Sequence, residues 1–488
     1  MRFAIIYPPV YRSGKIPLLG QNRQFKFTHS RQIKIYPLIP AHAASNLKAQ
    51  GHQVLFLDGI NEGMTAEGFD ERLDTFAPEI VMVETKTPII KTHWEWVKQF
   101  KLKYPACKVI LCGDHVTYFP EESMSNCPVD FILTGGDYDV LAMQLAAHLS
   151  GKGEMPAGVY YRENGEVKNS GRFKLDDNLD SLPYIDRDLT NWKTYGEAYL
   201  LRPCAYILTG RGCGREGKDT GGVCTFCIWQ HAFWARKARL RSAANVAGEV
   251  EMLVKKYGVH EIFDDNESGA VWNTAWMQEF LVEIEKRGIK GKFVISSNAR
   301  AENLTEGKCA LMKKIGYRLL KVGLESGDTA TLHRIGKLEK IEDIIENVKR
   351  AKRYGFKVLL TMMVGYPWEN EDSVKKTYAA AKELMLYKTH FGDSMQASII
   401  MPYPGTPLYK DAENNGWLTK DGKDYEKMDM EHNILKSNYD NEYWCKKMWN
   451  IHKHPLFLIK SLLSIRSPRE IALAFRGVKS LMGHTKDY

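Results

Sequence analysis

The chain has 488 residues, which is too many for one compact core, so we expect two or three domains. Hydrophobic residues make up 44% and charged residues 26%, which is typical of a folded globular protein and excludes a largely disordered chain. The net charge of +9 is compatible with an anionic partner but does not identify one.

The N-terminus "MRFAIIYPPV" predicts a first strand and not a signal peptide, and no run reaches the roughly 18 apolar residues of a membrane span. We therefore expect a cytoplasmic protein. Its nine irregularly spaced cysteines predict reduced thiols, with any cluster of them binding metal or taking part in catalysis.

Residues 1–150 alternate short β-rich runs with helical patterns, which predicts a doubly wound parallel sheet covered on both faces. The runs are "FAIIYPP", "VLFLDG", "EIVMVET", "KVILCGDH" and "DFILTGG". Ligands bind such sheets at the carboxyl ends of the strands, so the loops after Tyr7, Leu57, Glu84 and Cys112 form a candidate site. None of them carries G-x-G-x-x-G, so a dinucleotide is not indicated.

Residues 151–200 predict a hairpin, with its turn at Asn164-Gly165, followed by an aspartate-rich connector. From residue 201 to about 410 at least six further strand–helix units predict an α/β domain, a full or partial (β/α) barrel. Polar residues stand at its strand ends, where barrels keep their chemistry: Cys213, Asp264, Asn298, Glu325 and Tyr366. Residues 411–488 predict a helical C-terminal region.

Three cysteines, Cys213, Cys224 and Cys227, lie within fifteen positions after the first barrel strand. With His231 they could form a C-x₁₀-C-x₂-C-x₃-H zinc site, and unligated thiols are a second alternative. The glycine-rich loop at a strand end favours a third, an iron–sulfur cluster held by three thiolates with one iron open.

These residues resemble the signature of the radical S-adenosylmethionine (SAM) superfamily, C-x₃-C-x-aromatic-C. "RGC" and "CTFC" match its two ends, Phe226 takes the aromatic position, and "REGKDTGG" is interpreted as a loop insertion between Cys213 and Cys224. Cys204 is a weaker substitute for the first ligand. Other segments resemble the cobalamin-domain subgroup, which includes the anaerobic magnesium-protoporphyrin ester cyclase and hopanoid methylases: "YPP", "CGDHVTYFPEE", "FDDN", "GLESG", "VGYPWEN" and "PYPGTPLY".

The resemblance, over residues 1–410, implies a [4Fe–4S] cluster on the three cysteines and a 5′-deoxyadenosyl radical formed from SAM. It implies a Rossmann-like cobalamin-binding-type domain over residues 1–150 and a radical SAM partial barrel over residues 201–410. The implied SAM-binding residues are Phe226, Asp264, Arg300, Glu325 and Ser326. The implied cobalamin-binding residues are Pro8, Pro9, His115, Thr117 and Gly135.

Methylation of an unactivated carbon in a lipid-like or natural-product substrate is the leading interpretation. Its alternative is radical cyclisation, oxidation or carbon–carbon bond formation without cobalamin, since "DGINEG" (residues 58–63) lacks the histidine of the D-x-H-x-x-G motif and "TGGDYD" departs from the subgroup's "G-E-G-E". His115 could equally be an ordinary buried loop histidine. A non-catalytic zinc protein is the third interpretation.

The expected partners are a small molecule or lipid-like substrate and an electron donor such as a flavodoxin or ferredoxin. No nucleic acid is expected, because the basic residues are not concentrated in one domain. The tail "LFLIKSLLSIRSPREIALAFRGVKSLMGH" has apolar residues at helical spacing with cations between them. It predicts either a helical pair packed on the barrel or a basic surface that contacts anionic lipid.

Overall fold

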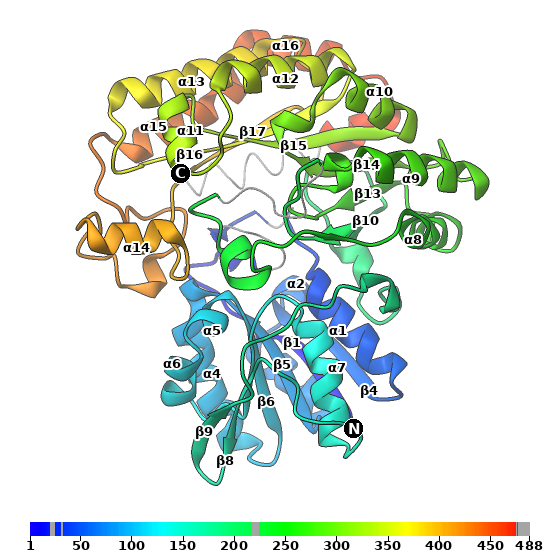
Figure 1. The fold of residues 1–488 in the computed structure, drawn as a ribbon, viewed down its shortest axis with the longest axis vertical. Coiled ribbons are helices and arrows are strands. Elements are labelled where there is room, and N and C mark those ends of the chain that lie inside the picture. The colour runs from blue at the N-terminus through cyan, green and yellow to red at the C-terminus, as the bar shows by residue number, and fades with distance from the viewer. Residues whose placement is uncertain (20–24, 31–32, 217–223, 475, 477–488) are drawn as a thin grey trace.

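The computed structural model describes residues 1–19, 25–30, 33–216, 224–474 and 476. Figure 1 shows two lobes stacked along the long axis, with the N-terminal sheet in one and the second parallel sheet in the other. Residues 217–223, most of the "REGKDTGG" insertion, lie outside the described residues. Among those described, no helix has the length and apolar character needed to cross a membrane.

The N-terminal lobe is a seven-stranded sheet in the order β4-β1-β5-β6-β7-β8-β9, with its first five strands parallel. The predicted doubly wound sheet is confirmed. Its strands are β1 Arg2–Tyr7, β4 Gln53–Asp58, β5 Ile80–Thr85, β6 Lys108–Gly113, β7 Phe131–Leu133, β8 Val159–Glu163 and β9 Glu166–Asn169. A two-stranded ribbon, β2 Ile16–Pro17 and β3 Phe27–Thr28, lies outside this sheet.

The predicted hairpin after residue 150 forms β8 and β9, which extend the N-terminal sheet in antiparallel fashion. Asn164 and Gly165 both have positive φ, of 54° and 85°, as a two-residue hairpin turn requires. The hairpin therefore belongs structurally to the first lobe.

Helices cover both faces of this sheet, because its central strands are apolar on both sides. α1 (Leu38–Ala49) and α7 (Tyr138–Leu149) pack side by side on one face, and α3 (Ala66–Phe76) and α4 (Ile90–Lys103) contribute to a separate core on the other. Short helices follow the strand ends: α2 Gly59–Glu62, α5 Asp114–Tyr118 and α6 Pro120–Asn126.

The second lobe is a six-stranded parallel sheet in sequential order, β10-β13-β14-β15-β16-β17. β10 and β17 are its two edges and do not pair, so the described strands form an open sheet and no closed barrel. The strands are β10 Cys204–Ile207, β13 Glu261–Asp264, β14 Val294–Ala299, β15 Tyr317–Glu325, β16 Lys357–Val364 and β17 Ser394–Ile399.

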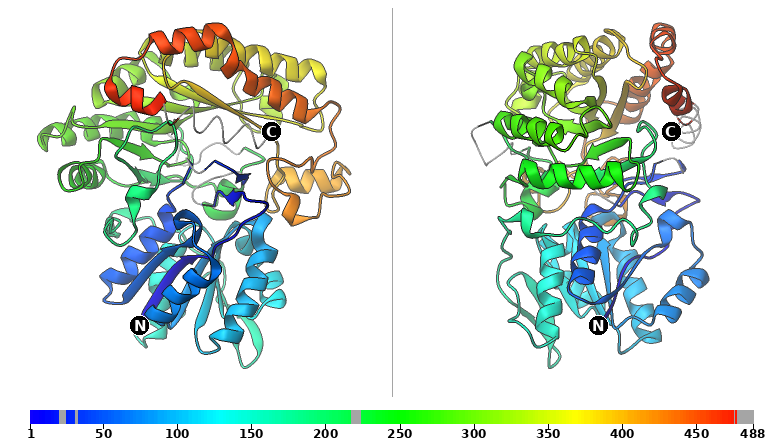
Figure 2. Two further views of the ribbon diagram at one scale, coloured as in Figure 1. Left: turned by 180° about the vertical axis from the view of Figure 1, so that it is seen from behind. Right: turned by 90° about the vertical axis from the view of Figure 1, so that its right-hand side faces the viewer.

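Helices connect these strands, and the chain ends in a helical region that packs beside β17 and α13. They are α8 Ala243–Lys255, α9 Thr274–Lys286, α10 Glu306–Ile315, α11 Thr329–Arg334, α12 Ile341–Arg353, α13 Glu371–Leu386, α14 Pro407–Asn414, α15 Asn441–Trp449 and α16 Pro455–Leu463. Figures 1 and 2 show the carboxyl ends of the first sheet facing the second lobe.

Candidate functional site

The three cysteines of the "RGC…CTFC" segment line one cavity in the second lobe. Cys213 is buried, and Cys224 and Cys227 are half-buried. Burial raises the pKa of the Cys224 thiol, while the cations of Arg300 and Lys337 act in the opposite direction. Three thiols converging on one cavity beside two cations suit an anionic, thiolate-held iron–sulfur cluster.

A short antiparallel ribbon positions the first cysteine. β11 (Gly210–Arg211) pairs with β12 (Arg239–Leu240) directly before Cys213. Gly212 has φ +92°, and a Cβ there would lie 2.0 Å from the Lys237 carbonyl oxygen, so only glycine fits. The Gly212 amide donates to a carboxylate oxygen of Glu267 at 2.7 Å, and Glu267 also lines the cavity.

The zinc alternative requires His231 to join the cysteines. Instead His231 Nε2 lies 3.3 Å from the backbone carbonyl of Cys224. Among the described residues, no three His, Cys, Asp or Glu side chains are grouped closely enough to hold a single metal ion. This includes Cys213, Cys224 and Cys227, whose sulfurs would each bind a different iron of a cluster. Cys204, the substitute first ligand, is buried at the start of β10 with its sulfur near the carbonyl of Tyr195, and it does not line the cavity.

Three of the five expected SAM-binding residues line this cavity: Phe226, Arg300 and Glu325. The other two do not. Asp264 is buried below it and accepts hydrogen bonds from the amide and hydroxyl of Thr209, at 3.1 and 2.8 Å. Ser326 is buried and donates to Glu369 at 2.9 Å.

Glu325 ends β15 in an unusual backbone conformation. Its φ is +60°, and the register of β15 against β16 shifts between Gly323 and Glu325. Its carboxylate lies 3.4 Å from the ammonium of Lys337, which is 4% exposed and also donates to the Gly323 carbonyl. The irregularity turns a charged side chain into the cavity, a feature common at functional sites.

Sequence reasoning missed Lys337, because it follows α11 in the unremarkable segment "RIGKLEK". It also missed the part of the cavity wall where β15, β16 and β17 contribute a mixture of apolar and polar side chains: Lys321, Thr361, Met362, Met363, Gln396 and Ser398. All six lie on strands that the hydrophobic pattern predicted, but Thr361, Met362 and Met363 are consecutive, so the alternation of facing sides along a strand does not identify the set.

A buried ion cluster joins this site to the N-terminal lobe. Arg211 binds both carboxylate oxygens of Asp139, at 2.9 and 2.6 Å, and one of Asp137 at 2.7 Å. Arg239 binds Asp137 as well, at 2.6 and 3.0 Å. Although burial opposes it, the two guanidinium groups hold the pKa of Asp137 below its ordinary value. The ribbon that carries Cys213 is thus fixed to the start of α7.

Aromatic side chains fill the space beside this cluster. The helical turn Trp229–Phe233, directly after the cysteines, and Trp234 are buried against the first lobe. A Cβ on Gly136 would lie 2.2 Å from the Trp234 ring, and the Gly136 amide donates to the Phe233 carbonyl at 3.2 Å. The loop after β7 is therefore packed closely against the segment after the cysteines.

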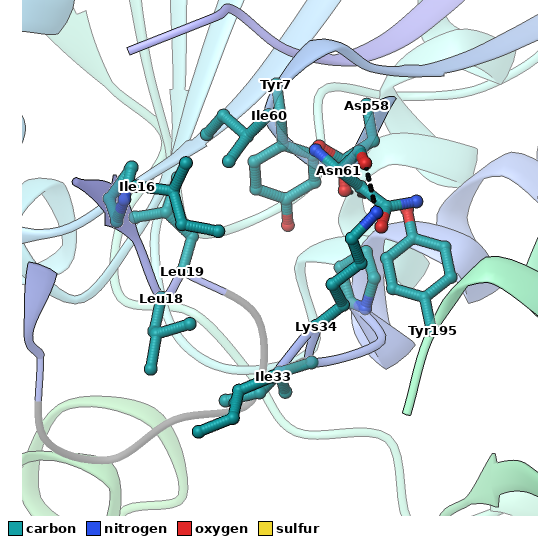
Figure 3. A pocket seen from close by; sticks show the side chains of 13 residues that line it. Tyr7, Ile16, Leu18, Leu19, Ile33, Lys34, Asp58, Ile60, Asn61 and Tyr195 are labelled. Atoms are coloured by element: carbon teal, nitrogen blue, oxygen red, sulfur yellow. Dashed lines mark hydrogen bonds between the residues drawn. The ribbon is translucent and has the colours of Figure 1, made fainter. Parts of the chain in front are cut away.

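A second, smaller pocket lies at the carboxyl ends of β1 and β4. Figure 3 shows apolar side chains on one side of it and polar ones on the other. Asp58 accepts from the amide of Asn61 at 2.8 Å and from the hydroxyl of Tyr195 at 2.7 Å. Asn61 Oδ1 is buried without a hydrogen-bond partner, and Lys34 donates to the Asn61 carbonyl at 2.6 Å.

Replacing Asp58 by asparagine is expected to change how stability depends on pH. Burial raises the pKa of Asp58 from 3.8 to about 6 against its hydrogen bonds. The protonated form thus stabilises the fold below about pH 4, and this contribution is lost as the pH rises through 6. Asp58→Asn should be more stable than wild type by about 2–3 kcal/mol at pH 7 and equal to it at pH 4.

Urea unfolding from pH 4 to pH 7 measures this difference. Asp177→Asn is the matched control, because Asp177 is 68% exposed and its ion-pair partner Lys237 is 44% exposed, so neither side chain is buried. The control should differ from wild type by less than about 1 kcal/mol throughout. A constant offset between Asp58→Asn and wild type at every pH would contradict the prediction.

The five expected cobalamin-binding residues do not line this pocket. Pro8 and Pro9 follow β1, and Pro8 is buried while Pro9 is half-buried. The His115 ring is buried, with its nitrogens 3.3 Å from Thr87 Oγ1 and 3.2 Å from Glu122 Oε2. Thr117 donates to the Gly113 carbonyl at 2.6 Å and accepts from the Gly135 amide at 3.1 Å. These contacts hold the loops after β6 and β7 together.

Comparison with known proteins agrees with this geometry. A protein of Pyrococcus horikoshii described as an uncharacterized methyltransferase is 28% identical over 433 residues, which cover 87% of this chain and 90% of the relative. The hopanoid C-3 methylase of Methylococcus capsulatus is 23% identical over 83% of this chain and 73% of its own.

Among solved structures, the cobalamin-dependent SAM radical enzyme OxsB with aqua-cobalamin bound has a TM-score of 0.68 and 16% identity. The match covers 98% of this chain and 72% of OxsB. Because the sequences are 16% identical, the match establishes the shared fold alone. The model of the radical SAM superfamily matches residues 207–381, which include the three cysteines, Arg300 and Glu325. This chain therefore carries a radical SAM domain over residues 207–381.

Proposed function

We propose that this protein is a cobalamin-dependent radical SAM methyltransferase that methylates an unactivated carbon of a small molecule. The observation that carries the proposal is the convergence of Cys213, Cys224 and Cys227 on one cavity with Arg300 and Glu325. When bound by the three thiolates, a [4Fe–4S] cluster supplies the electron that cleaves SAM.

The protein's own groups bind and orient the cofactor. The Phe226 segment would lie against the adenine of SAM, and Glu325 and Arg300 would contact its ribose and charged groups. Lys337 holds the Glu325 carboxylate from one side, at 3.4 Å, and so fixes its direction.

The pocket of Figure 3 is our candidate for part of the corrinoid site. The orphaned Asn61 Oδ1 could accept from an amide of the corrin periphery, and Ile60 offers an apolar surface in the same wall. Ile60 stands where the D-x-H-x-x-G motif has its histidine, so these walls fit a corrinoid whose cobalt has no histidine ligand from this loop.

The wall formed by β16 and β17 supports a small-molecule substrate of mixed polarity. Met362 and Met363 give an adaptable apolar surface, and Gln396 and Ser398 offer hydrogen-bonding groups beside it. A lipid-like or natural-product substrate and a flavodoxin or ferredoxin as electron donor are part of this proposal.

Anaerobic reconstitution with iron and sulfide tests the proposal. We expect about four iron atoms per chain, and 5′-deoxyadenosine after addition of SAM and a strong reductant. Alanine at Cys213, Cys224 or Cys227 should abolish both. Cys309→Ala, at a buried thiol of α10 outside the cavity, is the matched control and should retain them. Stoichiometric zinc without SAM cleavage would refute the proposal.

A second candidate is a radical SAM enzyme that works without cobalamin. The close packing of Trp234 on Gly136 favours it, because aromatic side chains fill part of the sheet edge that faces the second lobe. Corrinoid content distinguishes the two: hydroxocobalamin retained through gel filtration supports the first, and SAM cleavage without corrinoid binding supports the second.

A further inference from the structure

The helix α16 directs most of its apolar side chains away from the protein. Leu456, Leu458, Ile459, Leu462 and Leu463 are between 47% and 73% exposed, whereas Phe457 is 5% exposed. These five residues, which we call the α16 face, account for five of the fourteen exposed large hydrophobic residues among those described. A helix packed on the barrel through its apolar stripe would show the opposite pattern.

The helix is held in this orientation by contacts on its other side. At 100° per residue the α16 face covers one broad side, and Phe457 and Ser461 lie opposite it. Lys460 donates to the Leu386 carbonyl at the end of α13 at 2.9 Å, and Ser464 accepts from the Phe391 amide at 2.5 Å. The apolar side therefore stays turned outward.

Positive charge surrounds the α16 face. Lys453, Lys460, Arg466 and Arg469 are all exposed. The acidic residue in this stretch, Glu470, is buried and bound to Lys357 at 2.7 Å, so it does not offset the exposed cations. Apolar side chains rimmed by cations are complementary to a surface with an acyl interior and anionic headgroups.

We propose that the α16 face docks the protein on an anionic lipid bilayer, with the helix lying in the plane of the membrane. Its nine residues span about 14 Å, which is too short to cross a hydrocarbon core of about 30 Å. The leucine and isoleucine side chains enter the boundary between headgroups and acyl chains, and the flanking lysines and arginines bind the lipid phosphates.

Flotation of the full-length protein with vesicles tests this docking. Vesicles of phosphatidylcholine with about one third phosphatidylglycerol should carry the protein upward, and vesicles of phosphatidylcholine alone should carry much less. The double variant Ile459→Gln/Leu463→Gln should lower the partition coefficient on anionic vesicles at least about tenfold. Leu102→Gln/Val282→Gln is the matched control, because these residues are 77% and 59% exposed elsewhere and should leave binding unchanged.

Two results would overturn the proposal. One is equal flotation of wild type and Ile459→Gln/Leu463→Gln, with circular dichroism confirming that the variant is folded. The other is a wild-type protein that stays with the unbound fraction on both vesicles. If it also forms a dimer that the double variant disrupts, the α16 face binds a second copy of the chain and not lipid. Higher salt should weaken authentic docking, because it screens the flanking cations.

Discussion

Replacing Arg211 by methionine is expected to lower the free energy of unfolding by about 3–5 kcal/mol. The Arg211 side chain is 3% exposed and supplies both hydrogen bonds to Asp139, whose side chain is fully buried. Without it, Asp139 keeps a buried carboxylate with no cation, whereas Asp137 retains Arg239. Arg211 also immediately precedes Gly212 and Cys213, so the loss should loosen the segment that holds the proposed first cluster ligand.

Urea unfolding of purified protein measures this effect, and iron retention after reconstitution reports on the cysteine loop. Arg12→Met is the matched control. Arg12 and its ion-pair partner Glu426 are 36% and 45% exposed, so loss of this pair should lower the free energy of unfolding by less than about 1 kcal/mol. The double variant Arg211→Met/Asp139→Leu should recover much of the stability, because it removes the stranded charge. Equal losses for Arg211→Met and Arg12→Met would show that the cluster does not couple the lobes.

The regular elements of both sheets could be predicted because each buries its strands on both faces and so leaves a continuous apolar run in the sequence. Cys213 and Glu325 stand at predicted strand ends, and Cys224 and Cys227 follow in the loop after the first of them, which is why the cavity they share could be anticipated. Asp264 stands at such an end too, but its carboxylate is bound by Thr209, which follows the neighbouring strand β10. The position of Asp264 at a strand end does not reveal which group its carboxylate contacts.

The contacts between the lobes could not be predicted. Asp137 and Asp139 belong to "TGGDYD", a segment whose only sequence signal is its departure from a family pattern. Their partner Arg211 is more than 70 residues away in sequence. Long-range ion pairs leave no periodic signal. The orientation of α16 is a similar case, because an apolar stripe is the same in sequence whether it faces a core or the solvent.

Substitutions at Glu325 should separate its backbone strain from its proposed role in binding SAM. At φ +60° any residue with a Cβ is disfavoured, and glycine is not. Glu325→Ala and Glu325→Gly both remove the carboxylate that faces Lys337. We therefore expect Glu325→Gly to be about 1 kcal/mol more stable than Glu325→Ala towards urea, although glycine is the more flexible residue in the unfolded chain.

Both variants should bind SAM about 10- to 100-fold more weakly than wild type, as expected when a hydrogen bond to a charged group is lost. Anaerobic calorimetry on the reconstituted enzyme measures this affinity. Glu325→Gln keeps the side-chain shape and the strained backbone, so it should resemble Glu325→Ala in stability while retaining part of the affinity. A glycine variant that is both more stable and unable to bind SAM would mean that the strain at Glu325 is maintained for its function. Unchanged affinity in all three variants would remove Glu325 from the SAM site and leave Arg300 and Phe226 to hold the cofactor.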